Sequence, residues 1–244
     1  MAAVFSGQIL AADPAQVTLA TEATYPPFES INSQGQMVGF DVDVLKAICV
    51  KIQKNCRLVN QPWDSLIPGL ELGKFNVIFG AINITEERKK QINFTNPYYL
   101  ATGALVAPKA LKLSLDPQVL KNKTIGVQGS TTYEDYLRTV YGQNIQIKRY
   151  GSLQDAFLDL QSGRIDAVFG DSPVILSWVK SPGENSTYQV AGTVKDAKYF
   201  NSGYGFAMKK TNTDLVNQFN QGLAAIKADG SYQKIVQQYF GSNQ

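Results

Sequence analysis

The sequence predicts an α/β protein with two lobes of similar build. The first observation is an internal match, because DSLIPGLELGKFNVIFG (64–80) and DAFLDLQSGRIDAVFGD (155–171) align without gaps when Gly80 is set against Gly170. Each stretch contains an apolar-periodic helix, a glycine that supplies a left-handed helix stop, and a short apolar strand that ends in Phe-Gly. The second observation is that further strands and helices are predicted on both sides of each matching stretch.

The remaining elements can be placed in chain order from their hydrophobic periodicity. They are a strand at 17–23, a helix at 41–54, a strand at 123–127, a helix at 131–141, and two C-terminal helices interrupted at Gly230. The connections near 100–104 and 197–203 contain no Pro/Gly/Ser linker, which indicates a hinge between the lobes rather than a tether. We expect one lobe to comprise 16–103 plus 200–244 and the other to comprise 104–199.

The composition is that of an ordinary globular protein and excludes several kinds of site. The 244 residues are 44% hydrophobic and 18% charged, and the formal net charge is +3. Lysines and arginines are spread along the chain with acids between them, so the sequence contains no basic stripe of the kind that binds nucleic acid. The chain has no histidine and only two cysteines, which excludes Ser-His-Asp and Cys-His catalysis and a Cys/His zinc site. We expect no metal, no cofactor and no catalytic residue, although chemistry by carboxylates, Lys, Tyr or Ser stays open. No apolar run is long enough to span a bilayer.

The N-terminal stretch MAAVFSGQILAADPAQ has an apolar run that ends in the small residues Ala11 and Ala12. This pattern is typical of the end of a secretory signal at its cleavage site. The stretch has no basic region and is too short to be a whole signal. We therefore expect 1–15 to be a signal remnant or a disordered start that contributes little to the fold.

The two cysteines, Cys49 and Cys56, lie close together in CVKIQKNC. Cys49 falls on the inner face of the predicted 41–54 helix, and the chain can turn back after Lys54 to bring Cys56 beside it. A metal site lacks further ligands, and a redox motif would have two intervening residues. A structural disulfide is the preferred interpretation, and it favours an oxidising compartment.

The segment GAINITEERKKQINFTNPYY (80–99) raises the question of what Arg88 does. Thr85 can cap a helix, and the two glutamates that follow it suit the positive end of that helix. A cation gains least at this end, so Arg88 is out of place there. One interpretation is a solvent-exposed charged face, because Lys89 and Lys90 come next. The other is that Arg88 reaches into a cleft.

The predicted strands point to a cleft between the lobes. In open α/β sheets the ligand site lies beyond the carboxyl ends of the strands. Two such sheets facing each other would line a cleft with four segments: Thr21–Tyr25, Gly80–Asn83, Gln128–Thr132 and Gly170–Ser172.

These segments carry groups for both signs of charge. Thr131 follows Gly129 and Ser130 at a helix start, where free backbone N–H groups attract an anion, and Arg88 can bind a carboxylate bidentately. Asp171 ends a buried strand, where an acid is costly unless a cation pairs with it; capping the helix before Pro173 is the alternative role. Arg88 and Thr131 would form a site for an anion, and Asp171 and Asn83 a site for a cation. Together the two sites match the zwitterionic head of an α-amino acid.

Three further side chains suit the other end of such a ligand. Tyr25 and Trp63 can sandwich a side chain between their rings, although either can equally be a core or rim residue. Glu22 precedes the Tyr25 loop and can meet a cationic group.

The motifs ATYPPFES, GFDVDVLKAIC, DSLIPGLELGK, INITEERKKQINFTNPYY, RIDAVFGD and AAIKADGSYQKI together resemble the periplasmic amino-acid-binding proteins of ABC importers, solute-binding protein family 3. The resemblance covers about 20–240 and is strongest to the arginine-binding and lysine/arginine/ornithine-binding members. It implies a two-lobed fold of the type II periplasmic-binding-protein class, in which each lobe is a mixed sheet flanked by helices and the ligand cleft lies between lobes. Those members also carry the cysteine pair seen here.

The resemblance implies roles for individual residues. Arg88 and Thr131 would hold the ligand carboxylate and Asp171 the ammonium, while Tyr25 and Trp63 would stack on the side chain. Backbone or side-chain bonds would come from the segment that contains Gly80, Ala81 and Asn83, and Gln128 lies in the cleft segment that faces it. Basic-residue binders often have serines where this chain has Gly80, Ala81 and Asn83, and Glu22 stands where the family varies, so ligand identity is least fixed there.

The sequence therefore predicts a periplasmic, monomeric binding protein that captures L-arginine or a related cationic amino acid for an inner-membrane ABC permease. One alternative is a binder of glutamine or another polar amino acid. A second is a dehydratase on the same fold, for which Glu22 is the available carboxylate. A third is the sensor domain of a receptor.

Overall fold

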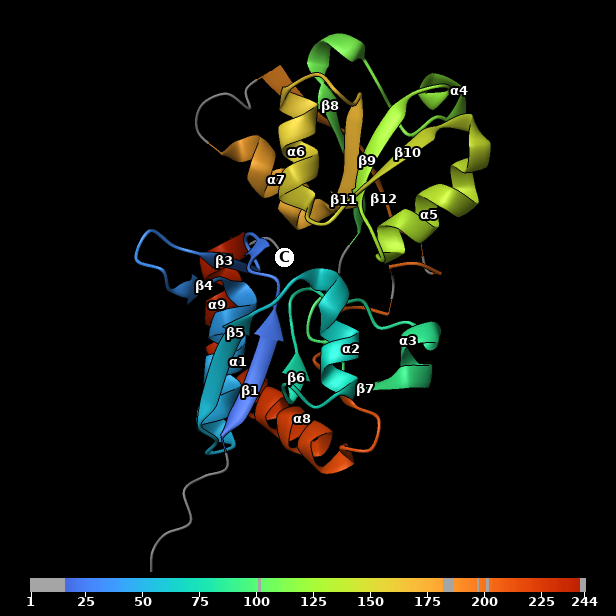
Figure 1. Ribbon diagram of the computed structural model, residues 1–244. Coiled ribbons are helices and arrows are strands. Elements are labelled where there is room, and N and C mark those ends of the chain that lie inside the picture. The colour runs from blue at the N-terminus through green and yellow to red at the C-terminus, as the bar shows by residue number, and fades with distance from the viewer. Residues whose placement is uncertain (1–15, 101, 182–186, 197, 201, 242–244) are drawn as a thin grey trace, which may run out of the picture.

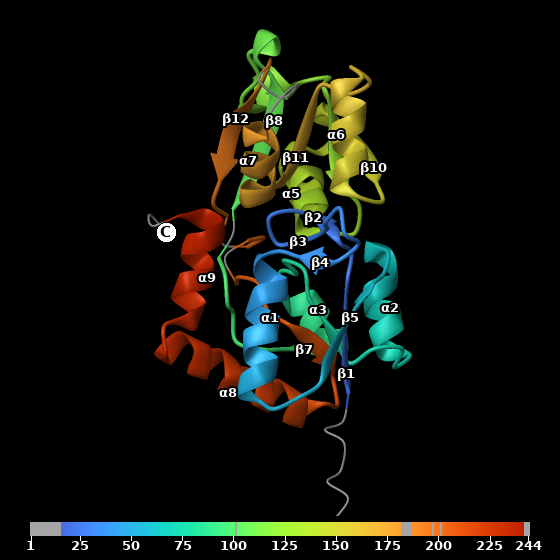
Figure 2. The ribbon, with the colours of Figure 1, turned by 90° about the vertical axis from the view of Figure 1, so that its left-hand side faces the viewer.

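The computed structural model describes residues 16–100, 102–181, 187–196, 198–200 and 202–241, so the expectation for 1–15 lies outside the described residues. Two five-stranded sheets lie one above the other, each flanked by helices (Figure 1). We call the sheet of order β5-β1-β6-β13-β7, with its helices, the first lobe, and the sheet of order β10-β9-β11-β8-β12 the second lobe. A small sheet, β2-β3-β4, belongs to the side of the first lobe that faces the second (Figure 2).

The first lobe is a mixed sheet covered on both faces. Its strands are β1 (Val17–Thr21), β5 (Cys56–Asn60), β6 (Val77–Ile78), β7 (Ile92–Phe94) and β13 (Ala207–Lys209), and the small sheet has β2 (Thr24–Tyr25), β3 (Glu29–Ile31) and β4 (Met37–Val38). Its helices are α1 (Phe40–Lys51), η1 (Trp63–Ser65), α2 (Leu66–Glu71), α3 (Glu86–Gln91), α8 (Thr213–Ala228) and α9 (Ser231–Phe240). Strand β1 pairs parallel with β5 and β6, whereas β13 is antiparallel to β6 and β7.

The second lobe repeats this plan. Its strands are β8 (Gly103–Pro108), β9 (Thr124–Gln128), β10 (Gln146–Tyr150), β11 (Ala167–Asp171) and β12 (Tyr188–Val194). Its helices are η2 (Lys109–Leu111), α4 (Pro117–Leu120), α5 (Thr132–Tyr141), η3 (Gly142–Asn144), α6 (Leu153–Gln161) and α7 (Ser172–Lys180). Strand β9 is parallel to β10 and β11, and β8 is antiparallel to β11 and β12.

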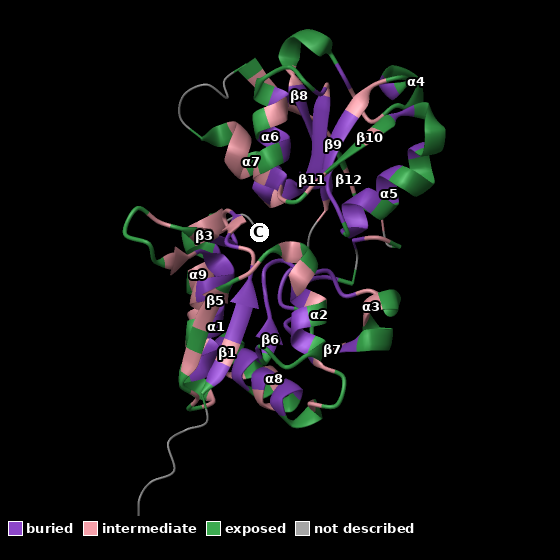
Figure 3. Ribbon diagram, in the orientation of Figure 1, coloured by how far each residue is buried: buried purple, intermediate pink, exposed green. Residues whose placement is uncertain are grey.

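Each sheet has a hydrophobic core on both of its faces, and successive side chains of a strand enter opposite cores. In β1, Leu19 packs with α1 and α8, while Ala20 joins the core under α2. In β11, Phe169 packs against α5 and Val168 faces α6 and α7. The middle strands of the two sheets, β6 and β11, are accordingly buried at every residue, while the outer helix faces are exposed (Figure 3).

Most predicted elements are confirmed, with shifted ends. The strand predicted at 17–23 ends at Thr21, and the helix predicted at 41–54 ends at Lys51, because Gln53 adopts φ 53° and Lys54 N–H donates to the Cys49 carbonyl at 3.0 Å. The turn brings Cys56 back to the helix, and the predicted disulfide Cys49–Cys56 is formed with a Cα–Cα distance of 6.2 Å.

The internal match is confirmed as a repeated helix–strand unit. The helix-ending glycines Gly73 and Gly163 have φ values of 75° and 67°, which glycine adopts without a Cβ clash. The strand that follows is longer in the second lobe, where β11 spans Ala167–Asp171, than in the first, where β6 spans Val77–Ile78.

The chain crosses between the lobes twice, between β7 and β8 and between β12 and β13. We keep the lobe limits 16–103 plus 200–244 and 104–199 as a proposal. Among the described residues, no helix is both long and apolar enough to cross a membrane.

Candidate functional site

A small cavity lies between the lobes, where the carboxyl ends of β1, β6 and β9 meet. Its lining contains every predicted binding residue except Asp171: Glu22, Tyr25, Trp63, Gly80, Ala81, Asn83, Arg88, Gln128 and Thr131. Four other residues complete it: Thr21, Glu29, Thr132 and Tyr133. The cavity volume is about 20 Å³, which is room for about one water molecule. An amino acid can therefore enter only when the lobes move apart.

Arg88 points into this cavity and is not a solvated surface charge. Thr85 caps α3 and accepts from Arg88 N–H at 3.1 Å, as predicted. The guanidinium donates from Nη1 to the Asn83 carbonyl at 2.8 Å and from Nη2 to the Ser130 carbonyl at 3.2 Å. Burial lowers the pKa of Arg88 to about 10, so it stays charged at neutral pH. By contrast, Lys89 bonds the exposed Glu86 on the helix surface.

Trp63 and Tyr25 are placed differently from each other. Arg88 Cζ lies 5.5 Å from the centroid of the Trp63 ring, and Trp63 Nε1 donates to the Ser130 carbonyl at 3.4 Å. Tyr25 is buried and stacks on Phe28 at 6.4 Å. Both rings line the cavity, so both remain candidates for contact with a ligand side chain.

The start of helix α5 differs from the expectation of free N–H groups. Thr131 is the N-cap, and its hydroxyl accepts from Glu134 N–H at 3.3 Å. Gly129 N–H donates to the Tyr150 carbonyl at 2.9 Å, and Ser130 N–H donates to Glu134 Oε2 at 2.8 Å. The prediction that these two amides are free is wrong, because β10 and the Glu134 carboxylate satisfy them within the second lobe.

Glu22 is held by two donors in the cavity wall. Gln128 Nε2 donates to Glu22 Oε2 at 2.6 Å across the lobes, and the Thr24 hydroxyl donates to Glu22 Oε1. Burial raises the pKa of Glu22, while the bonds from Thr24 and Gln128 oppose that rise. Among the described residues, the cross-lobe partner of this carboxylate is therefore an amide and not a cation.

Glu29 is a lining residue that sequence reasoning missed. It is 1% exposed, and its Oε2 has no partner among the described residues. Burial, followed by the charge of Asp41, raises the pKa of Glu29 well above its usual value. The available signal was an acid directly after Phe28 in an apolar motif, where a charge is costly.

Asp41 holds the segment that contains Gly80 and Ala81. Its Oδ2 accepts from Gly80 N–H at 3.1 Å, from Ala81 N–H at 3.0 Å and from the Tyr98 hydroxyl at 2.5 Å. Gly80 has φ 110°, and a Cβ there would lie 2.3 Å from Thr21 Oγ1. A serine at this position would therefore be strained and would require the Thr21 side chain to move.

Asp171 lies behind the cavity wall rather than in it. It is fully buried at the N-cap of α7, but its side chain makes no cap bond. Its Oδ2 accepts from the Tyr204 hydroxyl, and Tyr133, which lines the cavity, also contributes a side-chain hydrogen bond to Asp171. The helix-capping alternative is therefore not realised by the side chain, and Oδ1 has no partner among the described residues.

Hydrogen bonds across the lobes surround the cavity. Besides the Glu22–Gln128 bond and the two bonds to the Ser130 carbonyl, Asn83 Nδ2 donates to Thr132 Oγ1 at 3.0 Å. These contacts hold the lobes together around a nearly filled space. A ligand would replace some of them when it enters.

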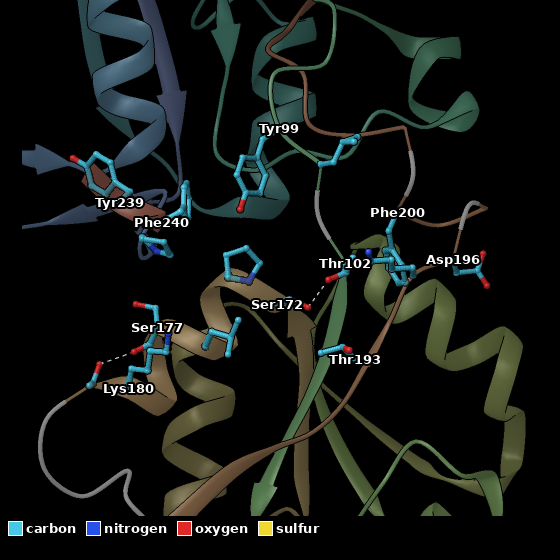
Figure 4. A pocket seen from close by; sticks show the side chains of 16 residues that line it. Tyr99, Thr102, Ser172, Ser177, Lys180, Thr193, Asp196, Phe200, Tyr239 and Phe240 are labelled. Carbon is cyan, nitrogen blue, oxygen red and sulfur yellow. Dashed lines mark hydrogen bonds between the residues drawn. The ribbon is translucent and has the colours of Figure 1, made fainter. Parts of the chain in front are cut away.

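A second, larger hollow of about 920 Å³ lies beside the crossing segments, between α7 and α9 (Figure 4). Tyr239 and Phe240 face it from α9, and Ser172, which bonds Thr102 at 2.7 Å, lines it with Lys180 from α7. None of the predicted binding residues is among the described residues that line it. We therefore place the candidate site in the smaller cavity. Among the described residues, no group of acidic or cysteine side chains could hold a metal ion.

Residues 17–242 match the family of bacterial extracellular solute-binding proteins, family 3. The chain belongs to this family. The family-3 protein is 42% identical over 227 residues to ABC transporter arginine-binding protein 1 of Escherichia coli strain K12, which covers 92% of this chain and 90% of the relative.

Solved structures of similar proteins agree with this family assignment. The family-3 protein resembles a periplasmic binding protein of Salmonella typhimurium described for its high arginine specificity, with a TM-score of 0.86 and 33% identity, covering 92% of this chain and 99% of the other. An ancestral arginine-binding protein, solved with arginine and with glutamine, has a TM-score of 0.85 and 36% identity over 93% of this chain and 98% of its own. The predicted type II periplasmic-binding-protein fold is confirmed.

Proposed function

We propose that this family-3 solute-binding protein captures a cationic L-amino acid, L-arginine above others, for uptake by an ABC transporter. The observation that carries the proposal is the charge pattern around the cavity. A guanidinium, Arg88, shares the cavity wall with the carboxylate of Glu22, and a second carboxylate, Asp171, is hydrogen-bonded to the lining residue Tyr133. One positive and two negative groups complement a ligand that carries one carboxylate and two cations.

In the proposed complex, Arg88 and Thr131 bind the ligand carboxylate, and Asp171 binds the ammonium. Arg88 can do this while it keeps its two backbone partners, because a guanidinium has five N–H donors. Asn83 is 4% exposed, and its Oδ1 has no partner among the described residues, so it can accept a further bond from the ammonium. The backbone groups of Gly80 and Ala81 border the same space.

The distal guanidinium of arginine would then replace Gln128 as the partner of Glu22. A charge-assisted bond to a guanidinium is stronger than the bond to a neutral amide. Trp63 and Tyr25 supply aromatic faces that suit a planar guanidinium better than a compact ammonium. We therefore expect arginine to bind more tightly than lysine or ornithine, and glutamine least tightly of these.

The relatives' names support an exported binding protein that delivers its ligand to a permease, and we propose that role here, as a non-catalytic monomer in the periplasm. The disulfide Cys49–Cys56 supports an oxidising compartment. Light scattering of the purified protein tests the monomeric state.

The experiment for this proposal is a thermal-shift screen of the common amino acids and ornithine, followed by calorimetry of every hit. We expect arginine to raise the melting temperature most. Glutamine or another neutral amino acid as the strongest ligand would overturn the assignment in favour of the neutral polar alternative. Absence of any amino-acid hit would reject the binding role itself.

A further inference from the structure

Tyr204 contacts both lobes. It lies on the crossing segment from β12 to β13 and forms isolated bridges with Asn83 and Tyr99 on the first-lobe side. Its side chain is 0% exposed, and its ring stacks on Tyr99 at 5.8 Å. The hydroxyl nevertheless reaches the second lobe, where it donates to Asp171 Oδ2 and lies 3.3 Å from the Tyr133 hydroxyl.

Asp171 has few polar partners: the hydroxyl of Tyr204 and, as a second phenol, that of Tyr133. Its carboxyl is 0% exposed, and Oδ1 has no partner among the described residues. The ion pairs found in the described part of the chain include none to Asp171. A buried carboxylate with so few partners carries a large desolvation cost until a cation reaches it.

We propose that Tyr204 is a positioning residue for the ligand ammonium, because its hydroxyl fixes Asp171 through Oδ2 and leaves the unpartnered Oδ1 to accept from the ligand. This inference rests on the proposed function, in which Asp171 binds the ammonium. It adds to the site a residue that lies outside the cavity lining and acts through Asp171.

The two oxygens of the Asp171 carboxylate show whether Tyr204 assists the binding of the ammonium or competes with it. A phenol that competed with the ligand would occupy the oxygen that the ammonium needs, and its removal would tighten binding. Here Tyr204 takes one oxygen while the other is left without a donor. A carboxylate accepts several bonds at once, so the ammonium and the phenol can share Asp171.

If Tyr204 positions Asp171, the effect of removing its hydroxyl on arginine affinity should depend on pH. Burial raises the pKa of Asp171 to about 7, and the bonds from Tyr204 and Tyr133 limit that rise. The other titratable groups that act on Asp171, or are acted on by it, are acids and phenols: Asp41, Glu29 and Tyr25. Without the Tyr204 hydroxyl, the pKa of Asp171 should rise by about one to two pH units, the size expected for one bond to a charged group.

The test is the affinity for arginine of wild type and Tyr204→Phe, measured by calorimetry between pH 6 and pH 9. Phenylalanine keeps the ring that packs on Tyr99 and removes only the hydroxyl. At pH 7 the variant should bind about 5- to 50-fold more weakly, because less of Asp171 is charged. The deficit should shrink to about twofold or less at pH 9.

Tyr141→Phe is the matched control. Tyr141 is also a buried tyrosine of the second lobe, and its hydroxyl donates to the Leu115 carbonyl at 2.8 Å, away from the cavity lining. Its affinity for arginine should equal that of wild type at every pH. As a second measurement, Tyr204→Phe should have no pH-dependent effect in an Asp171→Asn background, where the titrating group is gone.

The outcomes separate the two proposals. Failure of wild type to bind arginine or another amino acid would reject the proposed function. If wild type binds, three results for Tyr204→Phe would overturn the positioning role alone: unchanged affinity, tighter binding, or a deficit that is constant with pH. Only a deficit that fades as pH rises supports it.

Discussion

Replacing Arg88 with alanine removes the one basic side chain among the described residues that line the cavity. The side chain makes three contacts that define its place: the Asn83 carbonyl at 2.8 Å, the Ser130 carbonyl at 3.2 Å, and the Trp63 ring at 5.5 Å from Cζ. One of these, the bond to the Ser130 carbonyl, joins the lobes. The variant therefore loses both the proposed partner of the ligand carboxylate and a contact that favours closure.

The expected loss follows from the burial of the pair. Removing one partner of a desolvated, hydrogen-bonded charge pair costs about 2–5 kcal/mol of binding free energy. At about 1.4 kcal/mol for each factor of ten, the affinity for arginine should fall at least about 30-fold. Arg88→Lys keeps the charge without the bidentate geometry, so we expect it to recover only part of the loss.

The assay is calorimetric titration of arginine into wild type, Arg88→Ala and the control Lys89→Ala. Lys89 lies on the same short helix, but it pairs with the exposed Glu86 on the surface, so its removal should leave the affinity unchanged. The melting temperature without ligand checks that each variant is folded. An Arg88→Ala affinity within about tenfold of wild type would refute the role of Arg88.

Three further predictions concern the carboxyls and the disulfide. Asp171→Asn should weaken arginine binding at least about 30-fold by calorimetry; a smaller loss would remove the ammonium site. Burial raises the pKa of Asp41 to about 7, so the ligand-free protein should lose stability as pH rises from about 4 to about 7, and Asp41→Asn should flatten this slope in thermal melts. An unchanged slope would show that Asp41 titrates normally. Cys49→Ala with Cys56→Ala should lower the unfolding free energy by about 2–3 kcal/mol in urea titrations, and mass spectrometry that finds two free thiols in wild type would contradict the bond.

The sign of the pH prediction follows from proton binding. In the native state Asp41 holds its proton to about pH 7, whereas in the unfolded chain it releases it near its ordinary value of 3.8. Between these pH values the native state binds more protons, so stability falls as pH rises. Asp171 contributes in the same direction in the ligand-free protein.

Much of the fold could be predicted because local signals agreed with one another. The glycine stops at Gly73 and Gly163, the buried strand before Asp171 and the cap at Thr85 each depend on a few neighbouring residues. Strand ends were less predictable: β6 contains only Val77 and Ile78, since its length depends on pairing with β1 and β13.

The candidate site was predictable where it follows strand ends and motifs, as for Glu22, Asn83 and Arg88. It was not predictable where distant segments meet. Tyr204 is 33 residues from Asp171 in sequence, and nothing local shows that its hydroxyl reaches that carboxyl. The free amide expected at Gly129 was wrong for the same reason, because the fold brings Tyr150 to it. The bond from Ser130 N–H to Glu134 is instead local, because Glu134 lies three residues after the helix cap Thr131.

The most direct measurement of the central claim compares arginine with citrulline, a neutral ligand of nearly the same shape, on wild type and Glu22→Gln. If Glu22 selects a cation, wild type should bind arginine at least about tenfold more tightly than citrulline, because closure on the neutral side chain leaves Glu22 without its charged partner. Glu22→Gln should bring the two affinities together by weakening arginine. Equal affinities in wild type, or a ratio that Glu22→Gln leaves unchanged, would contradict recognition of a cationic amino acid by this cavity.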